Sequence, residues 1–379
     1  MPDVVNAVTW LVSSGGRRGA LVHLLKKSPR MSPSREAMSL SHEAMSPSHQ
    51  TQSRVVVVDS SPLSAAGRLA DAFELVPTND SPDFVDEILR IAKFHRAGVV
   101  IPTIDPEIIV YSNNRDRFRA ADVAVWVSGP VVAQLGANKW DLYGWLNKNG
   151  FPTIATVEKD TVEKDTVERD TVERDTVERD SFERDTVETD SFASAELSGP
   201  VVAKPRSGSS SIGVMFADAV GDIDLSQLGP EYIIQQRAPG IELTVDFAVD
   251  KNGRFLGAVP RRRLEVRAGE VSKGVTVKVP AVEDLVRELA KTLPDAYGVL
   301  NVQLFVEPDS GAMNIIEINP RFGGGYPLSH HAGADFITAL LRSDQGDSCQ
   351  VDWEPGTVML RYDEAAFFQS PGYAESPWQ

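Results

Sequence analysis

The chain has 379 residues, which is long enough for two or three domains with buried cores. Its content of 42% hydrophobic and 24% charged residues is that of an ordinary globular protein, and no apolar run approaches the ~18 residues of a membrane span. A formal net charge of −16 argues against a nucleic-acid partner, because binding to phosphates needs a basic surface.

Two further features bear on the compartment. The single cysteine, Cys349, excludes an internal disulfide framework and a metal cage built from cysteines. The amino terminus lacks a basic start followed by a cleavable small-residue site, so we expect no signal peptide. We therefore expect a cytoplasmic protein without a membrane partner.

The first third of the chain alternates short apolar strands with helices. Strands are predicted over residues 7–13, 54–59, 73–76, 98–101 and 123–127, and helices over residues 20–27, 63–72, 84–96 and 106–119. Because these strands are too apolar to be half exposed, they predict a doubly wound parallel sheet over residues 1–127. Residues 28–53, rich in Ser, Pro, Met and His, lack an apolar period and are interpreted as a low-complexity insertion.

Ligands of such sheets bind at the loops that follow the carboxyl ends of the strands. Here these loops are residues 13–18, 59–62 and 102–107. The turn at Gly15-Gly16 does not match the GxGxxG pattern of dinucleotide-binding domains, which disfavours a dehydrogenase. Two helices are then predicted, residues 131–135 and 139–149, with Lys139 in a first turn, where its charge opposes the helix dipole.

Seven pentads such as Thr-Val-Glu-Lys-Asp occupy residues 156–190. A period of five matches neither a helix nor a strand, so neither element can bury all the valines. Residues 156–192 contain seven Glu and seven Asp against two Lys and four Arg, a net charge of −8 and half of the total. We interpret residues 156–192 as a non-catalytic low-complexity insertion, and a role in partner binding is the alternative.

Two strands are predicted around a small-residue loop. The first, residues 200–206, carries Lys204 near its end, and residues 207–213 form a loop rich in Ser and Gly before the strand 214–217. Backbone N–H groups of such a loop can bind a polyphosphate, although an ordinary flexible hairpin has the same composition.

The remaining pattern predicts antiparallel strands over residues 232–236, 242–249, 254–259, 299–306 and 313–318, with a helix over residues 281–293. The basic segment 261–273 is either a solvated edge or a site for an anionic substrate. In the last strand Glu317 and Asn319 share one face, and two oxygens at this spacing suit Mg²⁺.

Five ordered motifs resemble those of the ATP-grasp superfamily, in particular its carbamoyl-phosphate-synthase-like branch of carboxylate–amine ligases. They are Asn138-Lys139, Val202-Ala203-Lys204-Pro205, residues 233–246 (IIQQRAPGIELTVD), Asn301-Val302-Gln303 and residues 317–321 (EINPR). The chain departs from many relatives in two places, because Gln236 stands where the hinge residue is often Glu and Gln303 where the first metal ligand is often acidic.

The resemblance implies ATP and Mg²⁺ (or Mn²⁺) as cofactors, with Lys204 and Arg321 as catalytic residues. The residues implied to bind ATP are Lys139, Lys204, Ser207, Gly208, Ser209, Ser211, Gly213, Gln236, Ala238, Glu242, Gln303 and Glu317. Gln303, Glu317 and Asn319 are implied to bind the metal. The residues expected beside the substrate are Arg261, Arg263, Gly324 and Tyr326.

The resemblance to the ATP-grasp superfamily also implies an α/β protein in which a parallel-sheet domain precedes a two-part ATP-grasp fold with antiparallel sheets. The expected parts are residues 1–127, a linker and lid at 128–238, a carboxyl-terminal part at 239–362 and a tail at 363–379.

The implied activity is ATP-dependent ligation of a small carboxylate to an amine or similar nucleophile through an acyl phosphate, with release of ADP and phosphate. The implied partners are these small molecules, and a homodimer is left open. An ATP-binding regulatory protein with weak or no ligase activity is the alternative, because Gln303 is neutral and the insertion is large. Cys349 shows no nucleophile pattern, and His330 and His331 either line the substrate pocket or have a helix-cap or surface role.

Overall fold

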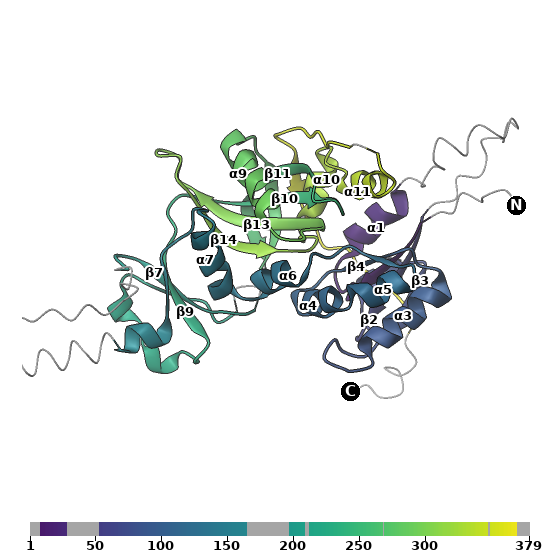
Figure 1. Cartoon of the computed structure of the whole chain (residues 1–379), viewed down its shortest axis with the longest axis horizontal. Helices are drawn as coiled ribbons and strands as arrows, with labels where there is room; N and C mark the ends of the chain where they lie inside the picture. The colour runs from purple at the N-terminus through teal and green to yellow at the C-terminus, as the bar shows by residue number, and fades with distance from the viewer. Residues whose placement is uncertain are drawn as a thin grey trace, which may run out of the picture. The chain divides into compact units, whose positions relative to one another are not determined.

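The computed structural model describes residues 8–28, 53–164, 197–208, 212–267, 269–347 and 349–369 (Figure 1). The chain divides into two compact units. The first comprises Met1–Ala133, Thr244–Asn301 and Asn319–Gln379, and the second comprises Gln134–Leu243 and Val302–Ile318. The domain boundaries expected at residues 127, 238 and 362 stay predictions.

The first unit contains the predicted parallel sheet. Its strands are β1 (Thr9–Ser13), β2 (Arg54–Asp59), β3 (Ala72–Leu75), β4 (Val99–Pro102) and β5 (Ala124–Val125). They pair in parallel in the order β3-β2-β1-β4-β5, so chain order reverses between β1 and β4. This topology confirms the doubly wound sheet, and in such sheets ligands bind beyond the carboxyl ends of the strands where the order reverses, here β1 and β4.

Helices cover both faces of this sheet, as the apolar strands require. They are α1 (Gly19–Lys27), α2 (Ala65–Leu69), α3 (Phe84–His95), α4 (Asp105–Asn113) and α5 (Arg115–Ala120). Trp10 and Leu11 point to opposite faces, and each is fully buried in its own core cluster. One helix was predicted over residues 106–119, but the structure has two, which meet at Asn114.

An antiparallel sheet follows, in the order β14-β13-β10-β11-β12-β15. Its strands are β10 (Ile241–Val249), β11 (Phe255–Arg267), β12 (Glu270–Thr276), β13 (Gly298–Val306), β14 (Met313–Asn319) and β15 (Val358–Leu360). β11 does not end at Val259, as predicted, but continues to Arg267 and pairs with β12, so the basic segment forms a hairpin. The helices after β12 are α9 (Pro280–Thr292), α10 (Tyr326–His331) and α11 (Phe336–Asp344), of which only the first was predicted.

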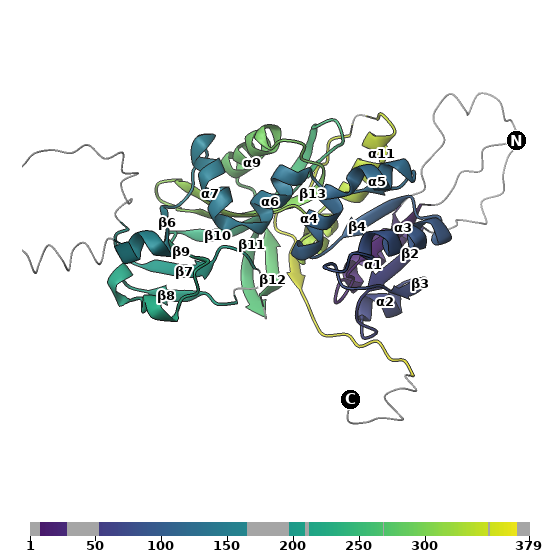
Figure 2. The same cartoon turned by 60° about the horizontal axis from the view of Figure 1, so that its bottom comes forward.

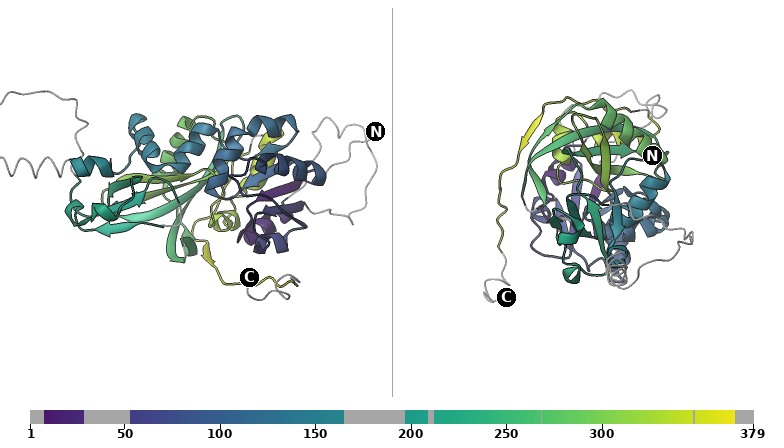
Figure 3. Two further views of the ribbon diagram at one scale, coloured as in Figure 1. Left: turned by 90° about the horizontal axis from the view of Figure 1, so that it is seen from below. Right: turned by 90° about the vertical axis from the view of Figure 1, so that its left-hand side faces the viewer.

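The second unit carries a smaller antiparallel sheet, seen in Figures 2 and 3. Its strands β6 (Thr156–Glu158), β7 (Val201–Pro205), β8 (Met215–Ala217) and β9 (Tyr232–Gln236) lie in the order β6-β9-β7-β8. The helices α6 (Pro130–Ala137) and α7 (Lys139–Lys148) precede it. None of the helices in the described residues is both long enough and apolar enough to cross a membrane.

The first pentad of the repeat belongs to the fold, so the predicted start of the insertion at residue 156 is wrong. Thr156–Glu158 form β6 and pair with β9, and Val157 is buried in the core cluster of this sheet. The repeat was expected to be excluded from the fold because its period cannot bury every valine. That reasoning applies to the repeat as a whole. A single pentad has one valine, and a short strand can bury it without any repeating pattern. Residues 165–196 lie outside the described residues, as do residues 29–52 of the insertion predicted at 28–53.

Candidate functional site

The first turn of α7 meets the loop that follows β7. Asn138 caps the helix, and its side-chain oxygen accepts hydrogen bonds from the N–H groups of Trp140 (2.9 Å) and Asp141 (3.3 Å). The backbone N–H of Lys139 donates to the carbonyl of Arg206 (2.9 Å), and Lys139 Nζ donates to that of Gly208 (2.8 Å). The predicted lid loop therefore begins beside Lys139.

The predicted loop residues are only partly described. Ser207, Gly208 and Gly213 are exposed, whereas Ser209 and Ser211 lie outside the described residues. Gly208 has φ +114° and Gly213 has φ +73°, conformations that favour glycine. The backbone conformation therefore favours glycine at positions 208 and 213 of the loop.

Lys204 is desolvated and lies near a second cation. Its Nζ donates to Gln235 Oε1 (2.8 Å), and Gln235 Nε2 donates to Thr156 Oγ1 (2.8 Å). Burial, with repulsion from Lys139, lowers the pKa of Lys204 to about 8, while Glu317 acts in the opposite direction. Lys139 and Glu317 therefore both act on Lys204 within the second unit. Gln235 was missed, although it directly precedes the predicted hinge residue.

The predicted hinge lies at the end of β9. The backbone N–H of Gln236 donates to Ala155 O (2.9 Å), and its side chain donates to Ser198 O (3.3 Å). Ala238 follows the strand and Glu242 lies near the start of β10. Between them Gly240 has φ +93°, and a Cβ there would lie 2.2 Å from the carbonyl oxygen of Val306.

The predicted metal ligands lie on β13 and β14. Gln303 and Glu317 are half-buried, and Asn319 is buried. Within the described ranges, no group of three or more His, Cys, Asp or Glu side chains could hold a metal ion by itself. One carboxylate with neighbouring amides fits Mg²⁺, which commonly binds one or two protein carboxylates together with phosphates and water.

Arg321 is held by a carboxylate at the start of α4. Its Nε and Nη2 donate to the two oxygens of Asp105, at 2.5 and 2.7 Å. Nη2 also donates to Asn319 Oδ1 (3.3 Å), and Asn301 Nδ2 donates to the Arg321 carbonyl (3.1 Å). Asp105 was not singled out, but it begins α4 and falls within residues 102–107, one of the stretches where a ligand was expected.

A second ion network adjoins this pair. Glu270 Oε1 lies 3.4 Å from Arg18 Nη1, and Glu270 Oε2 lies 2.8 Å from Arg361 Nη1. Burial and the nearby Arg321 lower the pKa of Arg18, yet a guanidinium stays charged in proteins. Arg18, Arg321 and Arg361, with Asp105 and Glu270, are called the arginine cluster below.

Arg18 and Arg361 line a small cavity of about 20 Å³. Its other lining residues include Arg17, Phe322, Gly323, Gly324, Tyr326 and Pro327. A Cβ at Gly324 would lie 2.8 Å from Arg18 Nη1, so glycine allows the guanidinium to approach the backbone. Gly324 and Tyr326, both expected beside the substrate, thus lie at this cavity.

The three loops expected to bind a ligand meet at the carboxyl edge of the parallel sheet. Gly16 N–H donates to Asp59 Oδ2 (2.9 Å), and Ser14 Oγ donates to Glu107 Oε1 (2.5 Å). Burial, with a smaller contribution from Asp59, raises the pKa of Glu107 to about 7. Glu107 Oε2 is buried and has no hydrogen-bond partner among the described residues, which agrees with a protonated carboxyl.

The geometry of Arg261 favours a structural role over the expected substrate contact. Its Nε and Nη2 donate to the two oxygens of Asp246 (2.7 and 2.9 Å), and both residues are buried. Ser329 Oγ also donates to Asp246 (2.5 Å). A guanidinium fixed by a buried carboxylate in this way holds β11, β10 and α10 together. Arg263 lies on the same strand and is half-buried.

Solved structures share this fold over most of the chain. N5-carboxyaminoimidazole synthetase from Staphylococcus aureus, complexed with ADP, has a TM-score of 0.61 at 13% identity, covering 93% of this chain and 82% of that chain. The biotin carboxylase domain of the Hydrogenobacter thermophilus 2-oxoglutarate carboxylase, complexed with MgADP, has a TM-score of 0.60 at 14% identity (91% and 72% covered). L-Amino acid ligase from Bacillus licheniformis has a TM-score of 0.54 at 12% identity (90% and 74% covered). No curated protein sequence matches the chain.

The fold is that of ATP-grasp proteins, as the sequence motifs indicated. Two family models specify it further. Residues 229–364 match "ATP-grasp in the biosynthetic pathway with Ter operon", and residues 10–126 match "PylC-like, N-terminal domain". The carboxyl-terminal part of the chain is therefore similar to an ATP-grasp domain, and its amino-terminal part to a PylC-like domain.

Proposed function

We propose that the protein is an ADP-forming ligase that joins a small carboxylate to an amine or similar nucleophile. The observation that carries the proposal is the grouping of Lys139, Lys204 and Glu317, with Lys204 desolvated to a pKa of about 8. A buried lysine beside a second lysine is costly unless an anion is bound, and a nucleotide polyphosphate supplies that anion.

In this proposal the two lysines neutralise the phosphates, and the loop 207–213 covers them with backbone N–H groups. Gln236 and Ala238 contact the adenine and Glu242 the ribose, as in the family that the motifs resemble. Arg321, fixed by Asp105, stabilises the charge that develops on the transferring phosphoryl group. The substrate carboxylate attacks the γ-phosphorus, ADP leaves, and the amine then displaces phosphate from the acyl phosphate.

Glu317, Asn319 and Gln303 would supply protein oxygens to Mg²⁺, which when bound neutralises charge on the phosphates. Gln303 is neutral, so Glu317 is the main charged ligand in this scheme. Glu317→Gln should therefore weaken Mg²⁺ binding and lower the turnover rate.

The arginine cluster is our candidate for the carboxylate site. Arg18 and Arg361 both pair with Glu270, and Arg321 pairs with Asp105, so three guanidinium groups lie close together and give the cluster a positive charge. A substrate carboxylate would balance that charge with charge-assisted hydrogen bonds. These residues replace Arg261 as our substrate candidates, because Asp246 already holds its guanidinium.

One structural neighbour is named as an L-amino acid ligase, which makes amino acids the first substrates to test. Another is described as a domain dimer, so a homodimer is part of this proposal, as is a cytoplasmic location.

The experiment is incubation of the purified chain with Mg-ATP and paired panels of carboxylates and amines, with separation of the nucleotide products. We expect ADP and phosphate to form only when a suitable pair is present. Release of AMP and pyrophosphate would contradict the acyl-phosphate route. ATP binding without turnover for any pair would instead favour the regulatory alternative, which the neutral Gln303 motivates.

A further inference from the structure

Ser14 has a backbone conformation that residues other than glycine rarely adopt. It directly follows β1, one of the two strands between which the strand order reverses, and its φ of +48° lies in the left-handed region. Buried hydrogen bonds hold it there, because Thr103 Oγ1 donates to the carbonyls of Ser13 (3.0 Å) and Ser14 (2.8 Å). Backbone strain that the surroundings fix in this way is concentrated at functional sites.

The hydroxyl of Ser14 is oriented by a carboxyl group beneath it. Ser14 Oγ donates to Glu107 Oε1 (2.5 Å), and Glu107 is only 2% exposed whereas Ser14 is half-buried. A ligand would therefore meet the hydroxyl and not the carboxyl. A hydroxyl has one hydrogen and two lone pairs, and Glu107 already accepts the hydrogen. Ser14 Oγ is thus set to accept a hydrogen bond from a ligand that donates one.

The same short stretch of chain supports Ser14 and Arg321. In residues 103–107, Thr103 fixes the backbone of Ser14, Glu107 fixes its hydroxyl, and Asp105 holds the guanidinium of Arg321 with two hydrogen bonds (2.5 and 2.7 Å). Ser14 is therefore tied to the arginine cluster, which is our candidate for the carboxylate site, without being part of it.

We propose that Ser14 binds the amine substrate and passes a proton from it to Glu107. This inference rests on the proposed ligase function. An N–H of the ammonium group donates to Ser14 Oγ, and its proton moves to that oxygen as the Ser14 hydroxyl proton moves to Glu107 Oε1. The carboxylate becomes a carboxylic acid, and the amine becomes a neutral nucleophile. Its nitrogen then attacks the acyl carbon of the acyl phosphate. The bond from this carbon to the phosphate oxygen breaks, and the phosphate leaves with the electron pair and takes the second N–H proton.

The charges around Ser14 favour an ammonium group over a carboxylate. Asp59 Oδ2 accepts the N–H of Gly16 (2.9 Å), and this carboxylate is close enough to Glu107 to raise its pKa by repulsion. The other titratable group that acts on Glu107 is Tyr111, whose pKa burial raises, so its hydroxyl stays neutral. Burial is the main reason that the pKa of Glu107 is about 7, a value at which a carboxyl can both accept and release a proton near neutral pH.

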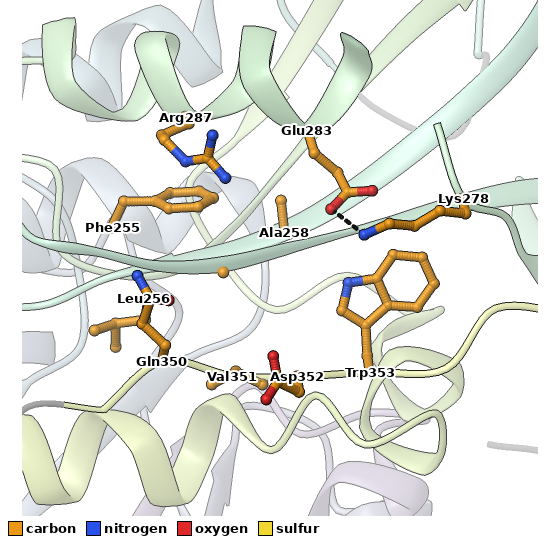
Figure 4. A pocket seen from close by; sticks show the side chains of 11 residues that line it. Phe255, Leu256, Ala258, Lys278, Glu283, Arg287, Gln350, Val351, Asp352 and Trp353 are labelled. Carbon is orange, nitrogen blue, oxygen red and sulfur yellow. Dashed lines mark hydrogen bonds and ion pairs between the residues drawn. The ribbon is translucent and has the colours of Figure 1, made fainter. Parts of the chain in front are cut away.

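Charged side chains in the larger cavity of the first unit already have partners. This cavity of about 180 Å³ lies among β11, α9 and the chain after α11 (Figure 4). Glu283 Oε2 accepts a hydrogen bond from Lys278 Nζ (2.7 Å), and Arg287 Nη1 donates to Asp284 Oδ1 (2.5 Å). We therefore assign this cavity no ligand, whereas Ser14 keeps lone pairs that a donor can reach.

Hydroxylamine separates the proposed proton transfer from the ATP step. It is largely uncharged at neutral pH, so it traps an acyl phosphate as a hydroxamate without first losing a proton to the protein. With Mg-ATP and a carboxylate–amine pair that the wild-type chain ligates, Ser14→Gly should form hydroxamate at the wild-type rate. It should ligate the amine about 100-fold more slowly. Glycine suits the φ of +48°, so this variant should fold.

Ser226→Gly is the matched control. Ser226 Oγ also donates to a carboxylate, Asp224 Oδ1 (2.6 Å), but on the exposed surface of the second unit. Both rates should stay at the wild-type value in this variant.

A pH profile tests the part that Glu107 plays through Ser14. In the wild-type chain, kcat/KM for the amine should rise with pH through about 7, because Glu107 must be ionised to accept the proton. Glu107→Gln keeps the size of the side chain but cannot accept a proton. It should remove this rise and slow ligation about 100-fold, while hydroxamate formation stays unchanged. An unaltered pH profile in Glu107→Gln would overturn the inference.

The two proposals fail in different ways. A wild-type chain that forms neither hydroxamate nor amide would overturn the proposed function and this inference with it. Amide formation at the wild-type rate in Ser14→Gly would overturn the inference alone. An equal loss of hydroxamate and amide in Ser14→Gly would also overturn it, because Ser14 would then act on the ATP step.

Discussion

Lys204 is the residue at which the energetic argument is most direct. Its amine is desolvated, hydrogen-bonded to Gln235 and repelled by Lys139, so an anion that approaches it recovers much of the lost solvation. Lys204→Met should reduce ADP formation about 100-fold or more, in line with the loss of one electrostatic contact to a transition state. The control is Lys148→Met at the exposed end of α7, which should leave the rate unchanged.

The pKa of Lys204 also predicts a pH dependence. The amine is charged below about 8 and loses its proton above that value in the free protein. Because the charged form binds ATP, affinity should fall as pH rises through this range, and binding near pH 8 should take up a proton. Calorimetry in buffers of different ionisation enthalpy measures that uptake. Lys204→Arg should abolish it, and unchanged uptake in that variant would place the titration elsewhere.

Glu107 makes an independent prediction about stability. Its pKa is raised from 4.5 to about 7, so the folded chain keeps a proton that the unfolded chain releases above 4.5. The contribution of this group to stability therefore falls as pH rises from 4.5 to about 7, and then stays constant. Glu107→Gln should raise the free energy of unfolding by about 1–3 kcal/mol near pH 8.

The same variant should gain little near pH 4.5, where both states hold the proton. Urea denaturation at the two pH values measures the difference. Glu288→Gln, on the surface, should show no such pH dependence. An equal gain at both pH values would mean that Glu107 is not the titrating group.

At the scale of elements, Gly240 fixes the connection between β9 and β10. It combines φ +93° with a site where a Cβ would lie 2.2 Å from the Val306 carbonyl oxygen. Gly240→Ala should lower the free energy of unfolding by about 2–4 kcal/mol, because strain and a backbone clash add. Gly253, with φ +76° and open space around it, is the control, and Gly253→Ala should cost about 1 kcal/mol. Equal losses in denaturant titrations would contradict the close approach at Gly240.

The repeat gives a second prediction at this scale. Removal of residues 168–194 leaves β6 and its pairing with β9 intact, so thermal stability and ATP binding should be retained. Removal of residues 156–192 also deletes β6 and the buried Val157, and should lower the melting temperature clearly. Differential scanning calorimetry of the two deletions distinguishes them. If both behaved alike, the first pentad would have no structural role.

Most elements were predictable from the sequence because their pattern is local. The apolar strands β1, β2 and β4 and the helices α3 and α9 show their period directly. The errors came where tertiary contacts override the local pattern. β11 continues through a run of arginines because Asp246 neutralises Arg261 inside the fold, and this partner lies on another strand.

At the scale of the whole chain, only those residues of the candidate site that belong to a local sequence motif could be predicted. Lys139, Lys204, Glu317 and Arg321 belong to ordered motifs, so their positions could be given in advance. Their partners could not. Asp105 precedes Arg321 by 216 residues, and Arg18 precedes Glu270 by 252, so no local pattern links them. The loops after β1 and β4 could be named as ligand loops, because a rule of sheet topology places them together.

The central claim is that a carboxylate attacks the γ-phosphorus of ATP. Its most direct test is the fate of oxygen when the chain turns over Mg-ATP with carboxylate substrates labelled with ¹⁸O. The account predicts ADP and inorganic phosphate that carries one ¹⁸O atom from the carboxylate, read from the isotope shift in the ³¹P NMR spectrum. Label in AMP, or phosphate formed without any label, would contradict it.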